Sequence, residues 1–110
     1  MNLPRAVIFD WDGTLVDSEP LWVEAERAIA ARHGVTLTTE QCASLCGLTT
    51  ENANTELIAM IGQPLDWREV AEEKRAYVVR IESERPLMWR PGAEDLMEDL
   101  YEAGVPCGVY

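Results

Sequence analysis

The fold is decided by the stretch Phe9-Asp10-Trp11-Asp12-Gly13-Thr14-Leu15-Val16-Asp17-Ser18-Glu19. The apolar run over residues 6–9 leads into it, and an Asp-Gly pair breaks the pattern shortly afterwards. A short apolar run with β-branched residues before such a break predicts a buried strand, of the kind found in parallel sheets. Residues 10–14 are therefore expected to form a loop at the carboxyl end of this strand, which is where ligands bind in open α/β sheets.

Asp10 and Asp12 are the candidate chemical groups of this loop. Two carboxylates separated by one residue repel each other unless a cation lies between them. Hard oxygen donors at a phosphate site favour Mg²⁺. One carboxylate can attack phosphorus to form an aspartyl-phosphate, while the other protonates the leaving group and then takes a proton from water. Gly13 would let the backbone turn sharply near a phosphate.

The same residues also fit simpler structures. Asp-Gly is a common turn, and Asp-x-Asp opens many calcium loops. A calcium loop of the EF-hand type needs oxygen ligands at its fifth and twelfth positions, which here are Thr14 and Leu21, so that alternative is excluded. The spacing alone leaves catalysis and an ordinary turn open.

Helical spacing of apolar residues follows the loop and predicts five helices. Thr38 with Gln41, and Asp66 with Glu69, predict capping boxes at two helix starts. The expected elements are helices over 19–33, 38–46, 50–61, 67–84 and 91–103, and a second strand over 105–110. A connection of about 90 residues between two parallel strands is far longer than an ordinary crossover. The pattern therefore predicts an α/β fold with a four-helix insertion after the first strand.

Beyond spacing, the motif resembles the first motif of the haloacid dehalogenase-like hydrolase superfamily, which is a strand followed by Asp-x-Asp-Gly-Thr. Residues 15–19 are similar to the branch of phosphatases and phosphoglucomutases whose helical cap is inserted just after that motif. Residues 90–105 resemble the re-entry into the family's core. The resemblance implies a Rossmann-like core with an inserted four-helix cap. Its expected segments are 1–17 for the first core strand and catalytic loop, 18–87 for the cap, and 88–110 for a core helix and the second core strand.

Carried over to this sequence, the resemblance gives each residue of the motif a role. Asp10 is similar to the family's nucleophile and Asp12 to its general acid/base. The Asp10 carboxylate and the Asp12 backbone carbonyl would hold Mg²⁺, and Gly13 and Thr14 would lie at the substrate's phosphate. The expected activity is a phosphatase of small phosphorylated metabolites, such as a sugar phosphate or phosphoglycolate, acting through an aspartyl-phosphate.

Asp12, Trp22 and Thr50 separate branches of the family. Members that cleave carbon–halogen or phosphonate bonds lack an aspartate at the position of Asp12. Trp22 stands where the mutase branch has a histidine, and Thr50 stands near its cap-loop arginine. These differences favour a phosphatase and leave a phosphomutase like beta-phosphoglucomutase as the alternative. The loop from Gly47 to Thr50 either selects the substrate or simply ends one helix and caps the next.

Composition excludes several classes of protein. The formal net charge of the 110 residues is −11, and no lysine or arginine stripe exists to neutralise phosphates, so we expect no nucleic-acid partner. No run of about 18 apolar residues predicts a membrane span, and Asp10 interrupts the first apolar run too early for a signal peptide. Three cysteines are an odd count, which predicts reduced thiols and a cytoplasmic location. The sequence leaves the oligomeric state open.

The family's later motifs are a Ser or Thr after the second strand, a Lys and an acidic pair, and all three would follow Tyr110. We therefore expect these 110 residues to be the front half of a hydrolase, with negligible activity and a poorly formed core by themselves. The alternative is a non-catalytic interaction module that docks on a partner through exposed strand edges.

Five further side chains have a structural interpretation. Cys42 and Cys46, with His33, suggest a zinc site, but the pair lies on an apolar helical face, which favours core packing. Lys74 is expected on a solvated helix face beside nearby glutamates. Trp11 is expected to pack under the helical insertion.

Overall fold

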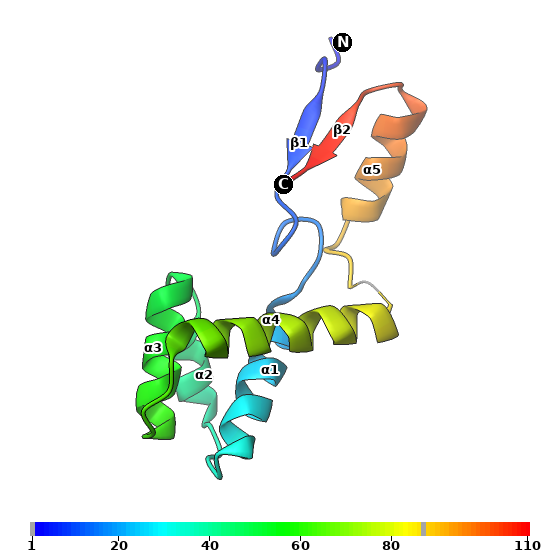
Figure 1. The fold of residues 1–110 in the computed structure, drawn as a ribbon. Helices are drawn as coiled ribbons and strands as arrows, with labels where there is room; N and C mark the ends of the chain where they lie inside the picture. Colours follow the sequence, from blue (N-terminus) through cyan, green and yellow to red (C-terminus); the bar gives the residue numbers. More distant parts are fainter. Residues whose placement is uncertain (1, 87) are drawn as a thin grey trace. The chain divides into compact units, whose positions relative to one another are not determined.

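The computed structural model describes residues 2–86 and 88–110 of the chain. Leu87, the last residue of the predicted cap segment, lies outside the described residues. The elements are β1 (Val7–Phe9), α1 (Glu19–Arg32), α2 (Thr39–Leu45), α3 (Thr50–Ile61), α4 (Trp67–Glu84), α5 (Ala93–Glu102) and β2 (Cys107–Val109), as Figure 1 shows. The predicted α/β class with a four-helix insertion between two strands is confirmed.

The chain divides into two compact units, which we describe separately. The sheet unit comprises Met1–Glu19 and Pro86–Tyr110, and the helical unit comprises Pro20–Arg85. No helix among the described residues is long and apolar enough to cross a membrane.

Two parallel strands form the centre of the sheet unit (Figure 1). Val7 pairs with Cys107 and Phe9 with Val109. One further bond extends the ladder, because the Tyr110 amide donates to the Phe9 carbonyl over 3.0 Å. The carboxyl ends of β1 and β2 therefore meet at the same edge of the sheet.

The first strand is less buried than the sequence predicts. Ile8 is 75% exposed, and Val109 on the neighbouring strand is 50% exposed. Side chains alternate between the two faces of a strand, and this sheet carries only α5 among the described helices. A short strand pair with one helix leaves an apolar face open, which explains the difference.

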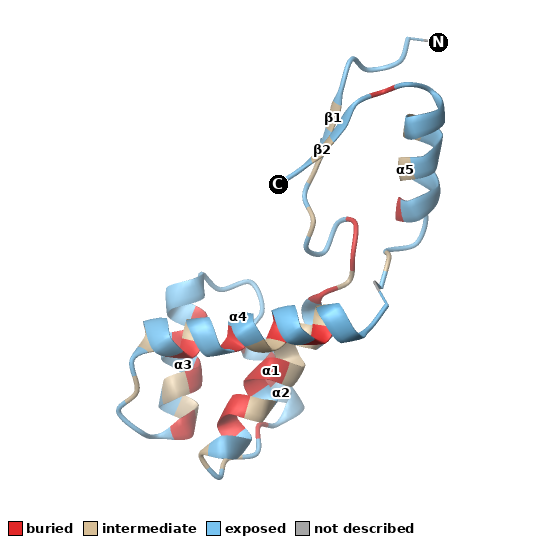
Figure 2. Ribbon diagram, turned by 45° about the vertical axis from the view of Figure 1, so that its right-hand side comes forward, coloured by how far each residue is buried: buried red, intermediate tan, exposed pale blue. Residues whose placement is uncertain are grey.

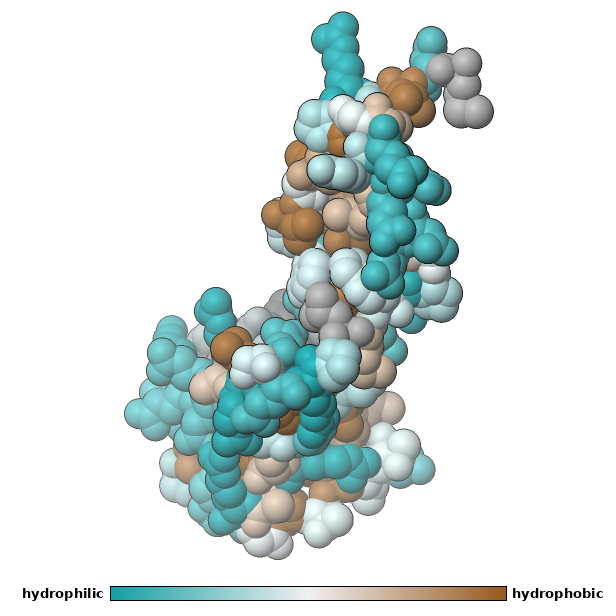
Figure 3. Space-filling model, turned by 90° about the vertical axis from the view of Figure 1, so that its right-hand side faces the viewer, coloured by the Kyte–Doolittle hydropathy of each residue, from teal (hydrophilic) through white to brown (hydrophobic). Residues whose placement is uncertain are grey.

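Helix α5 also buries less than its apolar spacing predicts. Ala93 is buried, whereas Leu96 is 47% exposed. Its remaining positions are rich in acidic side chains, and hydrophilic side chains gather over the sheet unit in the space-filling view (Figure 3). The acidic positions of α5 are Glu94, Asp95, Glu98, Asp99 and Glu102.

The helices of the helical unit begin and end at the residues that local rules select. Thr38 and Gln41 form the predicted capping box at the start of α2. Thr49 caps α3 by accepting from the Asn52 amide, and α3 ends at Gly62, whose φ of 76° is left-handed. Asp66 caps α4 by accepting from the Arg68 amide. The predicted capping box with Glu69 requires the Glu69 amide, which is one residue further along.

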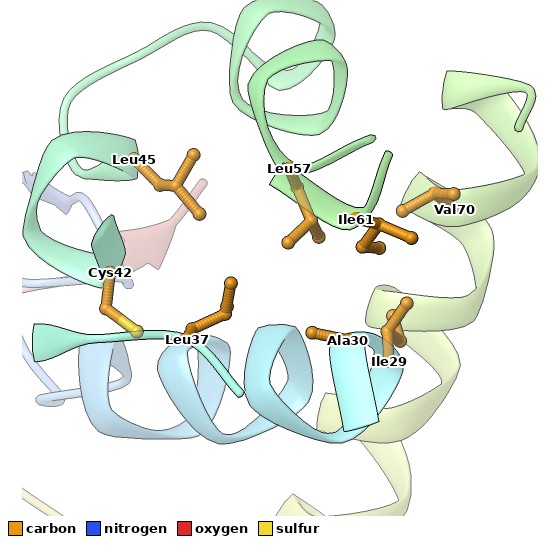
Figure 4. Close-up of a cluster of buried hydrophobic side chains, with 8 residues drawn as sticks. All are labelled: Ile29, Ala30, Leu37, Cys42, Leu45, Leu57, Ile61 and Val70. Carbon is orange, nitrogen blue, oxygen red and sulfur yellow. The ribbon is translucent and has the colours of Figure 1, made fainter. Parts of the chain in front are cut away.

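The core of the helical unit lies between α1, α2, α3 and the start of α4 (Figures 2 and 4). Its buried members are Ile29, Ala30, Leu37, Cys42, Leu45, Leu57, Ile61 and Val70. The cysteine prediction is correct for Cys42, but Cys46 is exposed one turn further along. Leu45 takes the core position beside Cys42 instead, because α2 ends there and Cys46 is its C-cap.

The prediction for Lys74 is wrong. Its side chain is 7% exposed, and Nζ lies 2.9 Å from Oε1 of Glu26, which is equally buried. The same nitrogen lies 5.8 Å from the centre of the Trp22 ring. Lys74 falls on the buried face of α4, and its charge is matched by a residue of α1 rather than by a neighbour on its own helix.

Candidate active site

Asp10 directly follows β1, at the edge where β2 also ends. Its side chain is exposed. The ladder bond between Tyr110 N and Phe9 O fixes the residue immediately before it. The sheet therefore presents the Asp10 carboxylate to solvent at the position that the sequence predicts.

The loop after Asp10 is a tight turn stabilised by its own backbone. The Trp11 carbonyl accepts from Leu15 N and Val16 N over 3.1 and 3.2 Å. Gly13 N donates to the Val16 carbonyl over 2.8 Å. Gly13 has a φ of 76°, and a Cβ built there meets nothing within 4 Å. Glycine is therefore favoured here by the left-handed backbone rather than by lack of space.

Asp12 is exposed within this turn and has one described side-chain partner. The Ser18 hydroxyl donates to its Oδ1 over 2.7 Å, and Ser18 itself is 4% exposed. The sequence does not single out Ser18 as a residue of the site. A serine just before a helix ordinarily suggests an N-cap, and no local rule directs its hydroxyl back to an aspartate six positions earlier.

The far end of the loop is bound to the returning chain. Arg90 N donates to the Leu15 carbonyl over 2.8 Å, and Asp17 N donates to Met88 O over 2.7 Å. Val16 and Trp89 form an antiparallel bridge between these two bonds. This ladder joins the loop to residues 88–90 within the sheet unit.

Trp11 meets a second tryptophan beside this ladder. The Trp11 and Trp89 rings lie 6.0 Å apart at 72°, an edge-to-face contact. The described ring partner of Trp11 is therefore a residue of the returning chain within the sheet unit, and its packing against the insertion stays a prediction.

Gly47 and Thr50 belong to the helical unit. Gly47 has a φ of 79°, and Thr50 is the first residue of α3. The Thr50 carbonyl accepts from Asn54 Nδ2 over 2.7 Å. These contacts describe a helix end followed by a capped helix start, and the role of the loop in substrate selection stays a prediction.

The oxygen donors of the loop suit a hard cation only in part. Among the described residues, no group of three or more His, Cys, Asp or Glu side chains is placed to hold a metal ion. Mg²⁺ is commonly held by one or two carboxylates, with water and a substrate phosphate completing its octahedron. The Asp10 carboxylate and the Asp12 carbonyl fit such a partial donor set.

Comparison with known proteins gives four curated relatives, all named as phosphatases, of which two match most of the chain. The chain is 33% identical over 99 residues to a Drosophila melanogaster protein named probable pseudouridine-5′-phosphatase, covering 90% of this chain and 42% of that protein. It is 30% identical over 107 residues to the N-acetylmuramic acid 6-phosphate phosphatase of Pseudomonas aeruginosa, covering 96% of this chain and 46% of the relative. The chain therefore spans a little under half the length of these two relatives.

A solved structure shares the fold of the chain. The beta-phosphoglucomutase of Clostridium difficile matches with a TM-score of 0.67 at 24% identity, over 97% of this chain and 51% of that one. The model of the family described as haloacid dehalogenase-like hydrolase matches residues 7–110. The match includes both strands, the five helices and the Asp10–Thr14 loop. The chain belongs to the haloacid dehalogenase-like hydrolase family.

Proposed function

We propose that the protein is a Mg²⁺-dependent phosphatase of small phosphorylated metabolites, of the sugar phosphate or phosphoglycolate type. The observation that carries the proposal is the placement of Asp10 and Asp12 on one tight turn at the carboxyl edge of a parallel strand pair. In a chain of this family, that placement supports a nucleophile and an acid/base acting on the same phosphate ester.

The reaction has two half-steps in this proposal. A carboxylate oxygen of Asp10 attacks phosphorus, and the bond between phosphorus and the ester oxygen breaks. Asp12 gives its proton to that oxygen, so the product leaves as a neutral alcohol. Water then attacks the aspartyl-phosphate and Asp12 takes its proton, which releases inorganic phosphate and restores the Asp10 carboxylate.

Other groups of the loop bind rather than react. Bound Mg²⁺ would neutralise phosphate charge, with the Asp10 carboxylate and the Asp12 carbonyl among its ligands. Gly13 and Thr14 would lie against the phosphate, where the left-handed turn at Gly13 brings the backbone close. The net charge of −11 makes a cation important here, because the protein's own field repels a phosphorylated substrate.

The two compact units support a division of labour. We propose that the sheet unit is the catalytic core and that the helical unit, Pro20–Arg85, is the cap. Gly47 and Thr50 are then the cap-loop residues that select the substrate. Since the curated relatives are named for different phosphorylated compounds, substrate choice is expected to vary with the cap rather than with the Asp10 loop.

A phosphomutase is the second candidate, because a beta-phosphoglucomutase shares the fold. Trp22 and Thr50 stand where the mutase branch carries a histidine and an arginine for transferring and holding a second phosphate. The absence of this histidine and this arginine from the chain favours transfer of the phosphoryl group to water. Release of inorganic phosphate, rather than an isomeric sugar phosphate, separates the two activities.

The experiment is an Asp10→Asn substitution in the full-length protein. Phosphate release from a panel of sugar phosphates and phosphoglycolate is measured with Mg²⁺ and with excess chelator. The wild type is expected to release phosphate only with Mg²⁺, and Asp10→Asn is expected to lose turnover to background because an amide cannot form the acyl phosphate.

Asp66→Asn is the matched control, because it makes the same chemical change at a helix N-cap where asparagine serves equally well. It should keep wild-type turnover. Turnover retained by Asp10→Asn would refute the nucleophile assignment, and a wild type inactive on every ester would refute the proposed function.

A further inference from the structure

The bond between Ser18 and Asp12 joins a buried group to an exposed one. The Ser18 hydroxyl donates to Asp12 Oδ1 over 2.7 Å, and Ser18 is 4% exposed while Asp12 faces solvent. A hydroxyl has one proton to donate, so this bond uses the whole donor capacity of Ser18. A bond to a carboxylate is also among the stronger hydrogen bonds in proteins.

Ser18 lies between a hydrogen-bonded residue and the start of a helix. Its predecessor Asp17 donates its amide to Met88 O over 2.7 Å, and its successor Glu19 is the first residue of α1. The hydroxyl therefore projects from a residue whose predecessor is hydrogen-bonded to the returning chain. Asp12, in contrast, lies in an exposed turn where its side chain would otherwise be free to change rotamer.

The two carboxylate oxygens of Asp12 differ in their hydrogen bonding. Oδ1 accepts the Ser18 proton, whereas Oδ2 has no described hydrogen bond within residues 2–86 and 88–110. Oδ2 is therefore the oxygen that is left to face a reacting atom, while Oδ1 anchors the group. Such an arrangement aims one oxygen at a reacting atom and fixes its direction.

We infer that Ser18 is a positioning residue that orients the Asp12 carboxyl for proton transfer to the leaving group. The inference rests on the proposed function and deepens it. Ser18 does not touch the substrate, and its effect is exerted through the orientation of Asp12.

The test uses the dependence of the rate on the leaving group. An alkyl phosphate needs a proton on its departing oxygen, whereas p-nitrophenyl phosphate releases a stable anion without one. The value of kcat/KM includes this departure but not the later attack of water. Ser18→Ala in the full-length protein should lower kcat/KM roughly tenfold for an alkyl phosphate and less than about twofold for p-nitrophenyl phosphate.

Two controls separate positioning from loss of structure. Ser83→Ala removes a hydroxyl that donates over 2.6 Å to Arg80 O in α4, and it should change neither substrate's kcat/KM. Ser18→Thr and Ser18→Val have nearly the same shape and differ in the hydroxyl, so only Ser18→Thr should keep the alkyl phosphate rate. The thermal transition of each variant reports whether it folds.

A double-mutant cycle shows whether Ser18 acts through its partner. In an Asp12→Asn background, Ser18→Ala should have little further effect on the alkyl phosphate. Equal losses on both substrates, or undiminished losses in the Asp12→Asn background, would overturn the inference while leaving the phosphatase proposal intact. A wild type without phosphatase activity would overturn both.

Discussion

Lys74 and Glu26 form a buried ion pair within the helical unit. Each side chain is 7% exposed, and the two charged atoms lie 2.9 Å apart. Removing charges from water is costly, and their mutual attraction offsets that cost only while both partners are present. The pair is therefore more sensitive to loss of one member than to loss of both.

We predict that Lys74→Met lowers the free energy of unfolding by about 3–5 kcal/mol, because it leaves the Glu26 charge buried and unpaired. Urea unfolding at neutral pH measures the change. The double substitution Lys74→Met with Glu26→Leu should recover most of the loss, since well-packed apolar side chains replace such pairs at little cost.

Arg32→Gln is the comparison for this prediction. Arg32 and Glu73 lie 3.3 Å apart with side chains that are 56% and 52% exposed. Losing this pair should cost no more than about 1 kcal/mol, because water already screens it. Similar losses from Lys74→Met and Arg32→Gln would show that burial does not govern the strength of these pairs.

At the scale of elements, one half-exposed cluster links α1 to the middle and the end of α4. Arg85 donates from both terminal nitrogens to Glu24, over 2.8 and 3.0 Å, and Tyr77 Oη donates to the same carboxylate over 3.1 Å. The hydrogen bonds from Arg85, with a smaller contribution from Tyr77, hold the pKa of Glu24 below its ordinary value of 4.5. The cluster thus favours the folded state when Glu24 is charged.

The stabilisation has a definite pH range. Because the pKa of Glu24 is lower in the folded state, the contribution is complete above pH 4.5 and is lost as the pH falls through the lowered value. Arg85→Gln should therefore destabilise the protein at pH 7, and the difference from wild type should shrink toward zero in acid. Urea midpoints across this range measure it.

Arg75→Gln removes the same charge from an exposed position on α4. It should show no comparable loss in this acid range. A difference between wild type and Arg85→Gln that persisted unchanged below the folded pKa would contradict the role of the ionised carboxylate.

The elements themselves are largely predictable from sequence, because their signals are local. Thr38 and Gln41 lie within one turn, and Gly62 ends its helix by its own backbone conformation. The partners of Lys74 and Ser18 are not predictable in this way. Glu26 is 48 residues from Lys74, and their pairing depends on how α1 packs on α4.

The candidate site also has parts that local sequence signals predict and parts that depend on how the chain packs. The position of Asp10 after a strand follows from a short apolar run, so its motif is visible in the sequence. The edge-to-face contact of Trp11 with Trp89 depends on how the chain returns after residue 85, and the bond from Ser18 to Asp12 depends on the path of the turn between them. The exposure of Ile8 similarly depends on what covers a sheet face, which alternation alone does not specify.

At the scale of the whole molecule, the helical unit has its own core. Leu57 is fully buried there, among side chains that all come from Pro20–Arg85. We predict that a fragment of residues 20–85 folds alone, with a helical circular dichroism spectrum and a cooperative thermal transition. Its stability is expected to be modest, because a domain of about 60 residues buries only about 60% of its unfolded surface.

Two variants of this fragment test whether the buried core is responsible for its cooperative thermal transition. Leu57→Ala should cost about 2–5 kcal/mol and abolish the transition, since it opens a cavity. Val79→Ala, at a position 57% exposed, should leave the transition nearly unchanged. A fragment with gradual, non-cooperative melting would show that the helical unit needs the sheet unit to fold.

The short ladder between residues 15–17 and 88–90 has a consequence for how the chain tolerates change. Its hydrogen bonds keep the exit and the re-entry of the helical unit next to each other, so the insertion is topologically a long surface loop. The entropy of closing such a loop rises only with the logarithm of its length. Helices can therefore be lengthened, shortened or exchanged between these anchor points at small cost, while the turn that carries Asp10 and Asp12 keeps its hydrogen bonds.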